Sequence, residues 1–289
     1  TKPSGLPRWM AETVAQRLVR ATAELGPGAS TARLDAELLM AHALGVSRSD
    51  LLLRHMRDPA PPTFEDLFAR RQGDEPVAYI VGTADFHGLV LNVTPDVLIP
   101  RADSETLIEA ARAAFAGRAP ARILDCGTGS GALLLAALAL FGDARGIGTD
   151  RSAAALAIAR ENARRLELGL RARFERLDWD APGWADGLGR FDLILANPPY
   201  VEDGADLERV VRDHEPGGAL FAGPEGLDAY RVLIPQLAGL LAPDGVALVE
   251  IGYRQAEAVS AMALRAGLST TLHRDLAGRP RCLQISVDR

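Results

Sequence analysis

From residue 122 to residue 251, short apolar runs of about five residues alternate with longer segments that have helical periodicity. The apolar runs are nearly continuous, which is typical of strands covered on both faces of a parallel sheet. Strands separated by helices indicate crossover connections, so the region predicts a Rossmann-like α/β fold. The expected strands are 122–126, 146–150, 174–178, 191–196 and 246–251, the expected helices are 132–141, 153–168 and 227–241, and residues 270–274 and 282–287 are expected to form an antiparallel edge pair.

The N-terminal part of the chain has a different pattern. Apolar side chains recur at helical spacing over 9–25 and from Leu34 to Ala41, and two shorter helical segments are expected at 50–56 and 63–72. These segments predict a small helical bundle that docks a partner or stabilises the chain. Three domains are therefore expected: a helical docking domain (1–82), a linking β-hairpin (83–104), and an α/β domain (105–289). A helix is expected over 104–116, at the boundary between the last two.

Composition excludes several classes of protein. The 289 residues are 48% hydrophobic, but no apolar run reaches the roughly 18 to 20 residues of a membrane span, and no apolar core of a signal peptide follows Lys2. Only Cys126 and Cys282 are present and the five histidines lack ligand spacing, so we expect a cytoplasmic protein without a disulfide framework or a metal site. The net charge is −6, the wrong sign for a duplex-binding surface.

The sequence ILDCGTGSGA (123–132) joins an expected strand to an expected helix. Glycines at 127, 129 and 131 allow a tight turn and a close approach of a ligand to the backbone. Asp150 ends the next expected strand, where a carboxylate can accept hydrogen bonds from both ribose hydroxyls. Asp125 places a second carboxylate beside the loop, which would repel a pyrophosphate and suit a sulfonium group. The loop therefore predicts a nucleoside site and favours S-adenosylmethionine over NAD.

A second feature is FDLILANPPYVED (191–203), where an apolar strand runs into Asn197, Pro198, Pro199 and Tyr200. Neither proline can donate a backbone hydrogen bond, so the backbone here is stiff and leaves carbonyl oxygens unpaired. Asn-Pro is also a common turn signal, and an ordinary strand stop is one interpretation. The other is a binding elbow, because ligands of open α/β sheets lie outside the carboxyl ends of the strands. The segment alone leaves both open.

Further segments carry a family resemblance. Together with the loop, Asp150 and the NPPY elbow, the chain contains EPVAYIVG (75–82), LIPRADSE (98–105), EPGGALFAGPEGLDAYR (215–231), VEIG (249–252) and DLAGRPR (275–281). In this order they resemble the PrmC/HemK family, the protein-glutamine methyltransferases of class I release factors. The chain departs from the family pattern at Ala102 and Ser104, where PRPDTE is common, and in AGPEGL, which stands for GGxDGL.

The resemblance implies a class I S-adenosylmethionine-dependent methyltransferase domain. Its expected activity is N5-methylation of the glutamine in the Gly-Gly-Gln (GGQ) motif of class I peptide chain release factors, the protein partners in translation termination. Asn197 and Pro198 are expected to be catalytic, with Pro199 and Tyr200 also holding the substrate glutamine. The expected cofactor-binding residues are Asp125, Gly127, Thr128, Gly129, Ser130, Gly131, Asp150, Trp179 and Asn197, and further candidates near the site are Arg101, Glu105 and Glu250.

Three other functions share some of these features. A nucleic-acid amino-methyltransferase could hold the exocyclic amine of a flipped adenine or guanine in the same elbow. The acidic balance of residues 85–289, with 28 acidic and 22 basic side chains, argues against it. A non-catalytic S-adenosylmethionine-binding scaffold would not need the NPPY elbow, and an NAD oxidoreductase would bind nicotinamide. We therefore expect neither a direct nucleic-acid substrate nor membrane association.

Overall fold

The computed structural model describes residues 12–26 and 31–287, which divide into two compact units. One is formed by the described part of residues 1–82 together with Arg209–His214, a return segment that the sequence did not predict. The other comprises Thr83–Glu208 and the described part of residues 215–289. No helix in these two described ranges is long and apolar enough to cross a membrane.

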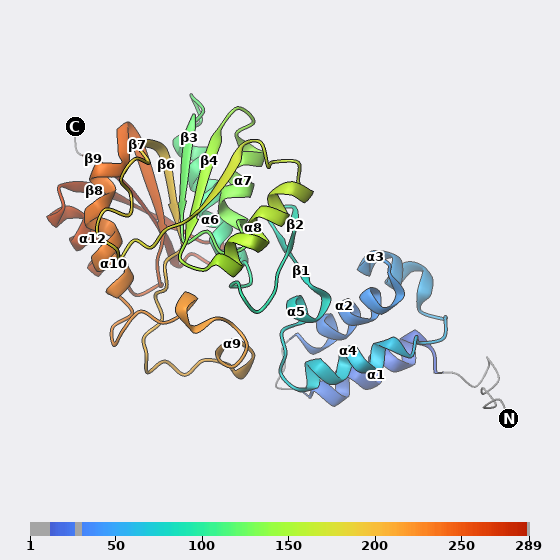
Figure 1. Cartoon of the computed structure of the whole chain (residues 1–289). Helices are drawn as coiled ribbons and strands as arrows, with labels where there is room; N and C mark the ends of the chain where they lie inside the picture. The colour runs from blue at the N-terminus through green and yellow to red at the C-terminus, as the bar shows by residue number, and fades with distance from the viewer. Residues whose placement is uncertain (1–11, 27–30, 288–289) are drawn as a thin grey trace. The chain divides into compact units, whose positions relative to one another are not determined.

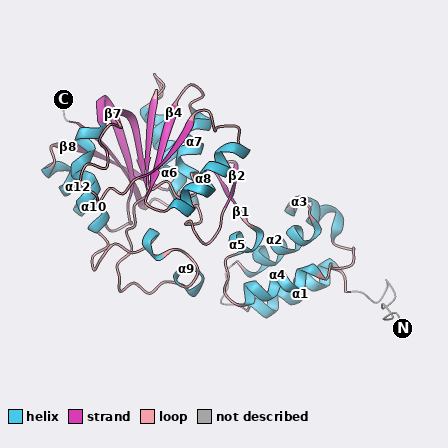
Figure 2. Ribbon diagram, viewed as in Figure 1, coloured by secondary structure: helices cyan, strands magenta, loops and turns pink. Residues whose placement is uncertain are grey.

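The larger unit is built on a seven-stranded sheet with the order β5-β4-β3-β6-β7-β9-β8 (Figures 1 and 2). The strands are β3 (Arg122–Cys126), β4 (Arg145–Asp150), β5 (Ala172–Arg176), β6 (Phe191–Ala196), β7 (Leu241–Glu250), β8 (Leu268–Arg274) and β9 (Pro280–Val287). The pairings from β5 to β7 are parallel, and β9 is antiparallel to both of its neighbours. The Rossmann-like α/β fold and its antiparallel edge pair are confirmed.

Both faces of the central strands β3 and β6 are buried, which explains their continuous apolar character. Ile123, Leu193 and Leu195 contribute to a core with α6, α7 and α8, while Leu124 and Ile194 contribute to a core on the other face with α10, α11 and α12. The helices are α6 (Glu105–Ala114), α7 (Ala132–Leu140), α8 (Ala153–Arg165), α10 (Asp228–Leu233), α11 (Leu237–Leu240) and α12 (Ala256–Arg265).

Several boundaries differ from the sequence prediction. The helix expected over 227–241 is divided into α10, the 3₁₀ turn η4 (Ile234–Gln236) and α11. Pro235 lies in that turn and lacks the N–H that a continuous helix needs. Leu241 begins β7, so this strand starts earlier than the expected 246–251. Helix α12 was not predicted; its buried residues are Val259 and Ala263, one turn apart.

The smaller unit is a helical bundle with its own core. It contains α1 (Val14–Leu25), α2 (Ala32–Leu44), α3 (Arg48–Asp50), the π-turn η1 (Leu51–His55), α4 (Thr63–Gln72), α5 (Val77–Val81) and, in the return segment, α9 (Arg209–Arg212). Helix α1 begins after a capping box formed by Thr13 and Gln16. Residues 9–11 of the helix expected over 9–25 lie outside the described residues. Helix α5 was not predicted, and α3 with η1 replaces the single helix expected over 50–56.

Within the expected linking hairpin (83–104), the paired strands are β1 (Thr83–Phe86) and β2 (Leu89–Asn92), so the hairpin ends at Asn92. The buried side chain of Asn162 joins it to the α/β core. The Oδ1 atom of Asn162 accepts from the backbone N–H of Asn92 at 2.7 Å. Its Nδ2 group donates to the carbonyls of Asn92 at 3.0 Å and Ser130 at 2.9 Å. One side chain on α8 therefore ties β2 to the loop that precedes α7.

We expect Asn162→Ala to lower the free energy of unfolding by about 2 to 4 kcal/mol, because it leaves the buried carbonyl of Ser130 and the partly buried backbone groups of Asn92 without these partners. Urea unfolding followed by circular dichroism measures the change. The matched control is Glu161→Ala at the preceding position, where the side chain is 42% exposed and little change is expected. Equal stability of the two variants would contradict the linking role of Asn162.

Candidate active site

The candidate site lies where the order of the sheet reverses. From β3 the chain continues to β4 and β5 on one side, and then crosses to β6 on the other side of β3. The register pairs Cys126 with Ala196, so the residues that follow these two strands begin side by side. Such a switch point opens a crevice at the carboxyl edge of the sheet. The predicted glycine-rich loop and the predicted elbow are thus brought together.

The glycine-rich loop is bent at three positions with positive φ, which are Gly127 (+74°), Gly129 (+54°) and Gly131 (+85°). A Cβ atom at Gly127 would lie 3.0 and 3.1 Å from the ring atoms Cη2 and Cζ3 of Trp179, so the indole packs directly on this backbone. A Cβ atom at Gly131 would lie 3.1 Å from Leu135. Glycine is therefore needed both for the turn and for the close contacts.

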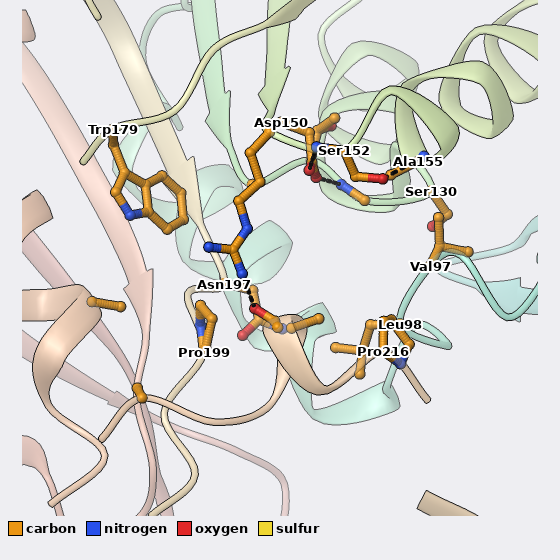
Figure 3. Close-up of a pocket in the computed structure, with 18 of the residues that line it drawn as sticks. Val97, Leu98, Ser130, Asp150, Ser152, Ala155, Trp179, Asn197, Pro199 and Pro216 are labelled. Carbon is orange, nitrogen blue, oxygen red and sulfur yellow. Dashed lines mark hydrogen bonds between the residues drawn. The ribbon is translucent and has the colours of Figure 1, made fainter. Parts of the chain in front are cut away.

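Asp150 is held against the loop by its own carboxylate. The Oδ2 atom accepts from the backbone N–H of Gly129 at 3.0 Å, and Oδ1 accepts from the N–H of Ser152 at 2.8 Å. In Figure 3, Asp150 and Ser152 lie on one side of the pocket, with Trp179, Asn197 and Pro199 around it. Since one carboxylate bonds both the loop and the start of α8, the strand end and the loop form one rigid wall.

A cavity of about 450 Å³ lies between these elements. The lining includes nine predicted site residues: Arg101, Gly127, Thr128, Gly129, Ser130, Asp150, Trp179, Asn197 and Pro199. Six others do not line it: Glu105, Asp125, Gly131, Pro198, Tyr200 and Glu250. The lining also contains residues that the sequence prediction missed, among them Val97, Leu98, Ser104, Arg151, Ser152, Asp178 and Pro216. The sequence position of four of them could have indicated a place in the site. Arg151 and Ser152 directly follow Asp150, and Ser104 and Pro216 lie in the motifs that carry the family resemblance.

Asp125 lies behind the loop instead of facing the cavity. Its Oδ2 atom accepts from the hydroxyl of Thr128 at 2.6 Å and from the backbone N–H of Leu134 at 3.3 Å. Its Oδ1 atom is buried and has no hydrogen-bond partner among the described residues. Burial raises the pKa of this carboxyl to about 7, although the bond from Thr128 opposes the shift and the charge of Asp150 adds to it. Asp125 thus joins the loop to the first turn of α7.

The elbow after β6 is held by polar side chains from distant segments. Asn197 Nδ2 donates to Ser104 Oγ at 3.2 Å. The hydroxyl of Tyr200 donates to Glu250 Oε1 at 3.1 Å, and the Tyr200 carbonyl accepts from Gln255 Nε2 at 3.0 Å. Glu250 is buried, and burial raises its pKa. The elbow is therefore fixed at both ends, by Ser104 at Asn197 and by Glu250 and Gln255 at Tyr200.

Two segments form the remaining wall of the cavity. The buried carboxylate of Glu215 accepts from Arg101 Nη2 at 2.5 Å and from the backbone N–H of Ile99 at 3.3 Å. Arg151 Nη2 donates to the Gly218 carbonyl at 3.2 Å. The predicted candidate Arg101 thus joins the segment before α6 to the segment that begins at Glu215. The other candidate, Glu105, accepts from the backbone N–H of His87 at 2.8 Å and holds the turn of the hairpin.

The chemistry of the lining fits a cationic nucleoside cofactor. Two arginines, Arg101 and Arg151, are outnumbered by carboxylates, and the carboxylate residues are Asp96, Asp150, Asp178, Asp180 and Asp228. Asp150 offers acceptors of the kind that ribose hydroxyls need, and Trp179 offers a flat ring. Within the described ranges, no group of three or more His, Cys, Asp or Glu side chains could hold a metal ion.

Comparisons with known proteins agree with this arrangement. Residues 119–262 match the model of a methyltransferase domain, and residues 16–82 match the PrmC N-terminal domain. The solved catalytic domain of hMettl16 has the same fold, with a TM-score of 0.55 and 16% identity over 78% of this chain and 83% of that chain. The sheet and the domain match define the chain as a methyltransferase of the class I fold, whose cofactor is S-adenosylmethionine.

The curated relatives define the family. The release factor glutamine methyltransferase of Caulobacter vibrioides is 41% identical over 81% of this chain and 82% of its own length. That of Moorella thermoacetica is 41% identical over 93% of this chain and 97% of its own length. The chain belongs to the family of release factor glutamine methyltransferases, so the resemblance seen in its motifs is confirmed.

The raised pKa of Asp125 makes stability depend on pH. Between about pH 4 and pH 7 the folded protein keeps a proton that the unfolded chain has released, so the stabilisation from Asp125 is complete below about pH 4 and is lost as the pH rises through about 7. Asp125→Asn removes this titration. Urea unfolding at about pH 5 and at about pH 7.5 gives the free energy of unfolding of the variant minus that of the wild type. This difference should be more positive at about pH 7.5 than at about pH 5.

The exposed carboxylate of Asp180, substituted by Asn, controls for the loss of one negative charge. If the difference between Asp125→Asn and the wild type stays constant over this range, Asp125 does not titrate there.

Proposed function

We propose that the chain transfers the methyl group of S-adenosylmethionine to the side-chain nitrogen N5 of the glutamine in the GGQ motif of class I peptide chain release factors. The observation that carries this proposal is the position of Asn197, which lines the cavity at the end of β6 beside the glycine-rich loop. The relatives are release factor glutamine methyltransferases, which supports a release factor as the substrate. We place the reaction in the cytoplasm, where release factors act.

The proposed chemistry depends on orienting a weak nucleophile. The lone pair of an amide nitrogen is delocalised into its carbonyl, so the site must position the nitrogen and oppose that delocalisation. We assign one amide N–H bond to the side-chain carbonyl of Asn197, which lines the cavity. The second is assigned to the backbone carbonyl of Pro198, and the flat face of the amide to the ring of Tyr200. Neither of these two residues lines the cavity, so both contacts rest on their places beside Asn197 and Pro199 in the elbow. Pro199 keeps the Pro198 carbonyl rigid because the Pro-Pro backbone is restricted.

The cofactor would be held by the loop of residues 127–131, with Asp150 at its ribose and Trp179 on its adenine. Bound S-adenosylmethionine would supply an activated methyl group on a sulfonium and leave as a neutral thioether, so the chain needs no general base before transfer. The methylated nitrogen then loses its extra proton to water. Asp125 contributes through Thr128 and Leu134, to which it is hydrogen-bonded, by keeping the loop in shape. The excess of carboxylates in the lining supports a cationic ligand.

The first test is peptide mass spectrometry of a class I release factor incubated with the protein and S-adenosylmethionine. We expect one methyl group on the GGQ glutamine, and we expect Asn197→Ala to lose on the order of 10²-fold in turnover because one preorganised polar group is removed. The matched control is Asn92→Ala, the same substitution outside the cavity, which should retain most of the activity.

RNA and DNA are incubated in parallel and their bases are analysed. Methylated bases with an unmodified glutamine would replace the proposed substrate by a nucleic acid, which the same elbow could hold. Near-normal turnover of Asn197→Ala would contradict the assigned role of Asn197.

We further propose that residues 1–82 form a substrate-docking domain, the linking hairpin covers 83–104, and the methyltransferase domain follows. The helical bundle exposes large apolar side chains, including Leu53 (80% exposed) and Val19 (65% exposed), which suit contacts with a protein partner away from its glutamine.

Leu53→Glu and Val19→Glu should each raise KM for a whole release factor about fivefold, which corresponds to about 1 kcal/mol of binding. KM for a short peptide containing the GGQ glutamine should not change, and steady-state kinetics on both substrates measure this. The control is Leu170→Glu. Leu170 is 93% exposed and precedes the amino end of β5, whereas the cavity lies at the carboxyl ends of the strands. An unchanged KM for the whole release factor would argue against docking through these positions.

A further inference from the structure

Trp179 lies on an irregular segment that follows β5. Its indole lines the cavity and packs on the backbone of Gly127 (Figure 3). The segment of residues 178–187 is described throughout and forms turns without a helix or a strand. Hydrogen bonds within it are short-range, such as that from the N–H of Trp184 to the carbonyl of Ala181 at 3.2 Å. Because such turns fix only neighbouring residues, the position of the indole depends on contacts from outside the segment.

Such contacts are present on both sides of Trp179. Before it, the backbone N–H of Leu177 donates to the carbonyl of Asp150 at 3.2 Å and continues the pairing of β5 with β4. After it, Nε2 of Gln236 donates to the backbone carbonyl of Trp179 at 3.3 Å. Oε1 of the same glutamine accepts from the indole N–H of Trp184 at 2.6 Å. One side chain on η4 therefore holds the segment at two places.

The orientation of the Gln236 amide is fixed by the chemistry of its partners. An indole N–H can only donate, and a backbone carbonyl can only accept. Because Trp184 donates, the end of the amide that faces it must be Oε1. The Nε2 end then donates to the carbonyls of Trp179 and Val232, at 3.3 and 2.8 Å. A flipped amide would place donor against donor and acceptor against acceptor, so one orientation satisfies all three groups.

Gln236 is placed for this role by the break between α10 and α11. Pro235 lies in the 3₁₀ turn η4, which Gln236 ends, and the bond to Val232 holds the side chain against the last turn of α10. Trp184 is 6% exposed and belongs to the same core as Leu233 of α10. Gln236 itself does not line the cavity. The anchor therefore lies on a packed element outside the site.

We propose that Gln236 is a positioning residue for the cofactor, which holds the segment 178–187 so that the indole of Trp179 stays against Gly127 and faces the adenine. Gln236 acts through Trp179 and not by touching the cofactor. Trp184 shares the role because its N–H selects the orientation of the glutamine amide. The inference deepens the proposed function. It rests on the place assigned there to Trp179 at the adenine, and not on the identity of the methyl acceptor.

Gln236→Met tests the proposal, because it keeps the length of the side chain and removes its three hydrogen bonds. We expect the Kd for S-adenosylmethionine, measured by calorimetry without a methyl acceptor, to rise about tenfold, the equivalent of about 1.4 kcal/mol. KM for S-adenosylmethionine should rise by a similar factor, while kcat and KM for the release factor change less than about threefold. The matched control is Gln284→Met. Gln284 is also partly buried and bonds His273 at 3.1 Å, but it does not line the cavity.

Double-mutant cycles show whether the effect passes through Trp179. In the Trp179→Ala background, Gln236→Met should raise the Kd for S-adenosylmethionine no further. Trp184→Phe keeps a packed ring without the N–H; it should raise the Kd about threefold alone and add little to Gln236→Met. Increases that multiply in the Trp179→Ala background would overturn the proposal, since Gln236 would then act independently of Trp179. An unchanged Kd in Gln236→Met would overturn it as well, even if the free energy of unfolding falls.

A spectroscopic readout separates this inference from the proposed function. In ¹⁵N-labelled full-length protein, the indole N–H signal of Trp184 is assigned by its loss in Trp184→Phe. Gln236→Met should shift this signal and speed its exchange with water. Gln236→Glu keeps the acceptor and should leave the signal protected, yet it should still raise the Kd because an ionised carboxylate has no donor for the Trp179 carbonyl.

An unchanged Trp184 signal in Gln236→Met would contradict the hydrogen bond on which the inference depends. If the signal and the Kd respond as expected while no glutamine is methylated, the substrate assignment fails and the role of Gln236 stands.

Discussion

The parallel pairing of β3 with β6 is the constraint on which the site depends. These two strands are adjacent in the sheet although β4, β5 and three crossovers separate them along the chain, and Cys126 is in register with Ala196. The glycine-rich loop follows the carboxyl end of β3 and the NPPY elbow follows that of β6, so both lie in one crevice. A shift of this register would move both segments and would turn buried strand side chains toward the opposite face.

Three buried carboxylates then hold the walls of that crevice. Asp125 ties the loop to α7, Glu215 ties Arg101 and the backbone of Ile99 to its own segment, and Glu250 holds Tyr200. Burial of a carboxylate costs free energy unless hydrogen bonds compensate for lost hydration. Oδ1 of Asp125 and Oε2 of Glu250 have no partner within the described residues, so part of that cost remains beside the cavity. The arrangement favours a rigid site over maximal stability.

Strands β3 and β6 were predicted at both ends because each is a short apolar run whose side chains are mostly buried on both faces. Segments whose structure depends on remote contacts were predicted less well. Helix α12 is recognisable mainly from what Val259 and Ala263 pack against, and the return of Arg209–His214 to the helical unit has no local signal. Pro235, by contrast, is a local signal in the sequence for the break in the helix expected over 227–241.

The class of fold, the turn after β3, the acidic end of β4 and the rigid elbow after β6 all follow from residue types that are neighbours in the chain. Tertiary packing sets which polar groups meet. Ser104 reaches Asn197 across 93 positions, and Glu215 reaches Arg101 across 114. It also placed Asp125 behind the loop, where spacing alone had suggested a carboxylate facing the ligand. Hydrogen bonds between loops depend on where the packed helices and strands end, because those ends set the positions of the loops. No local sequence pattern encodes these positions.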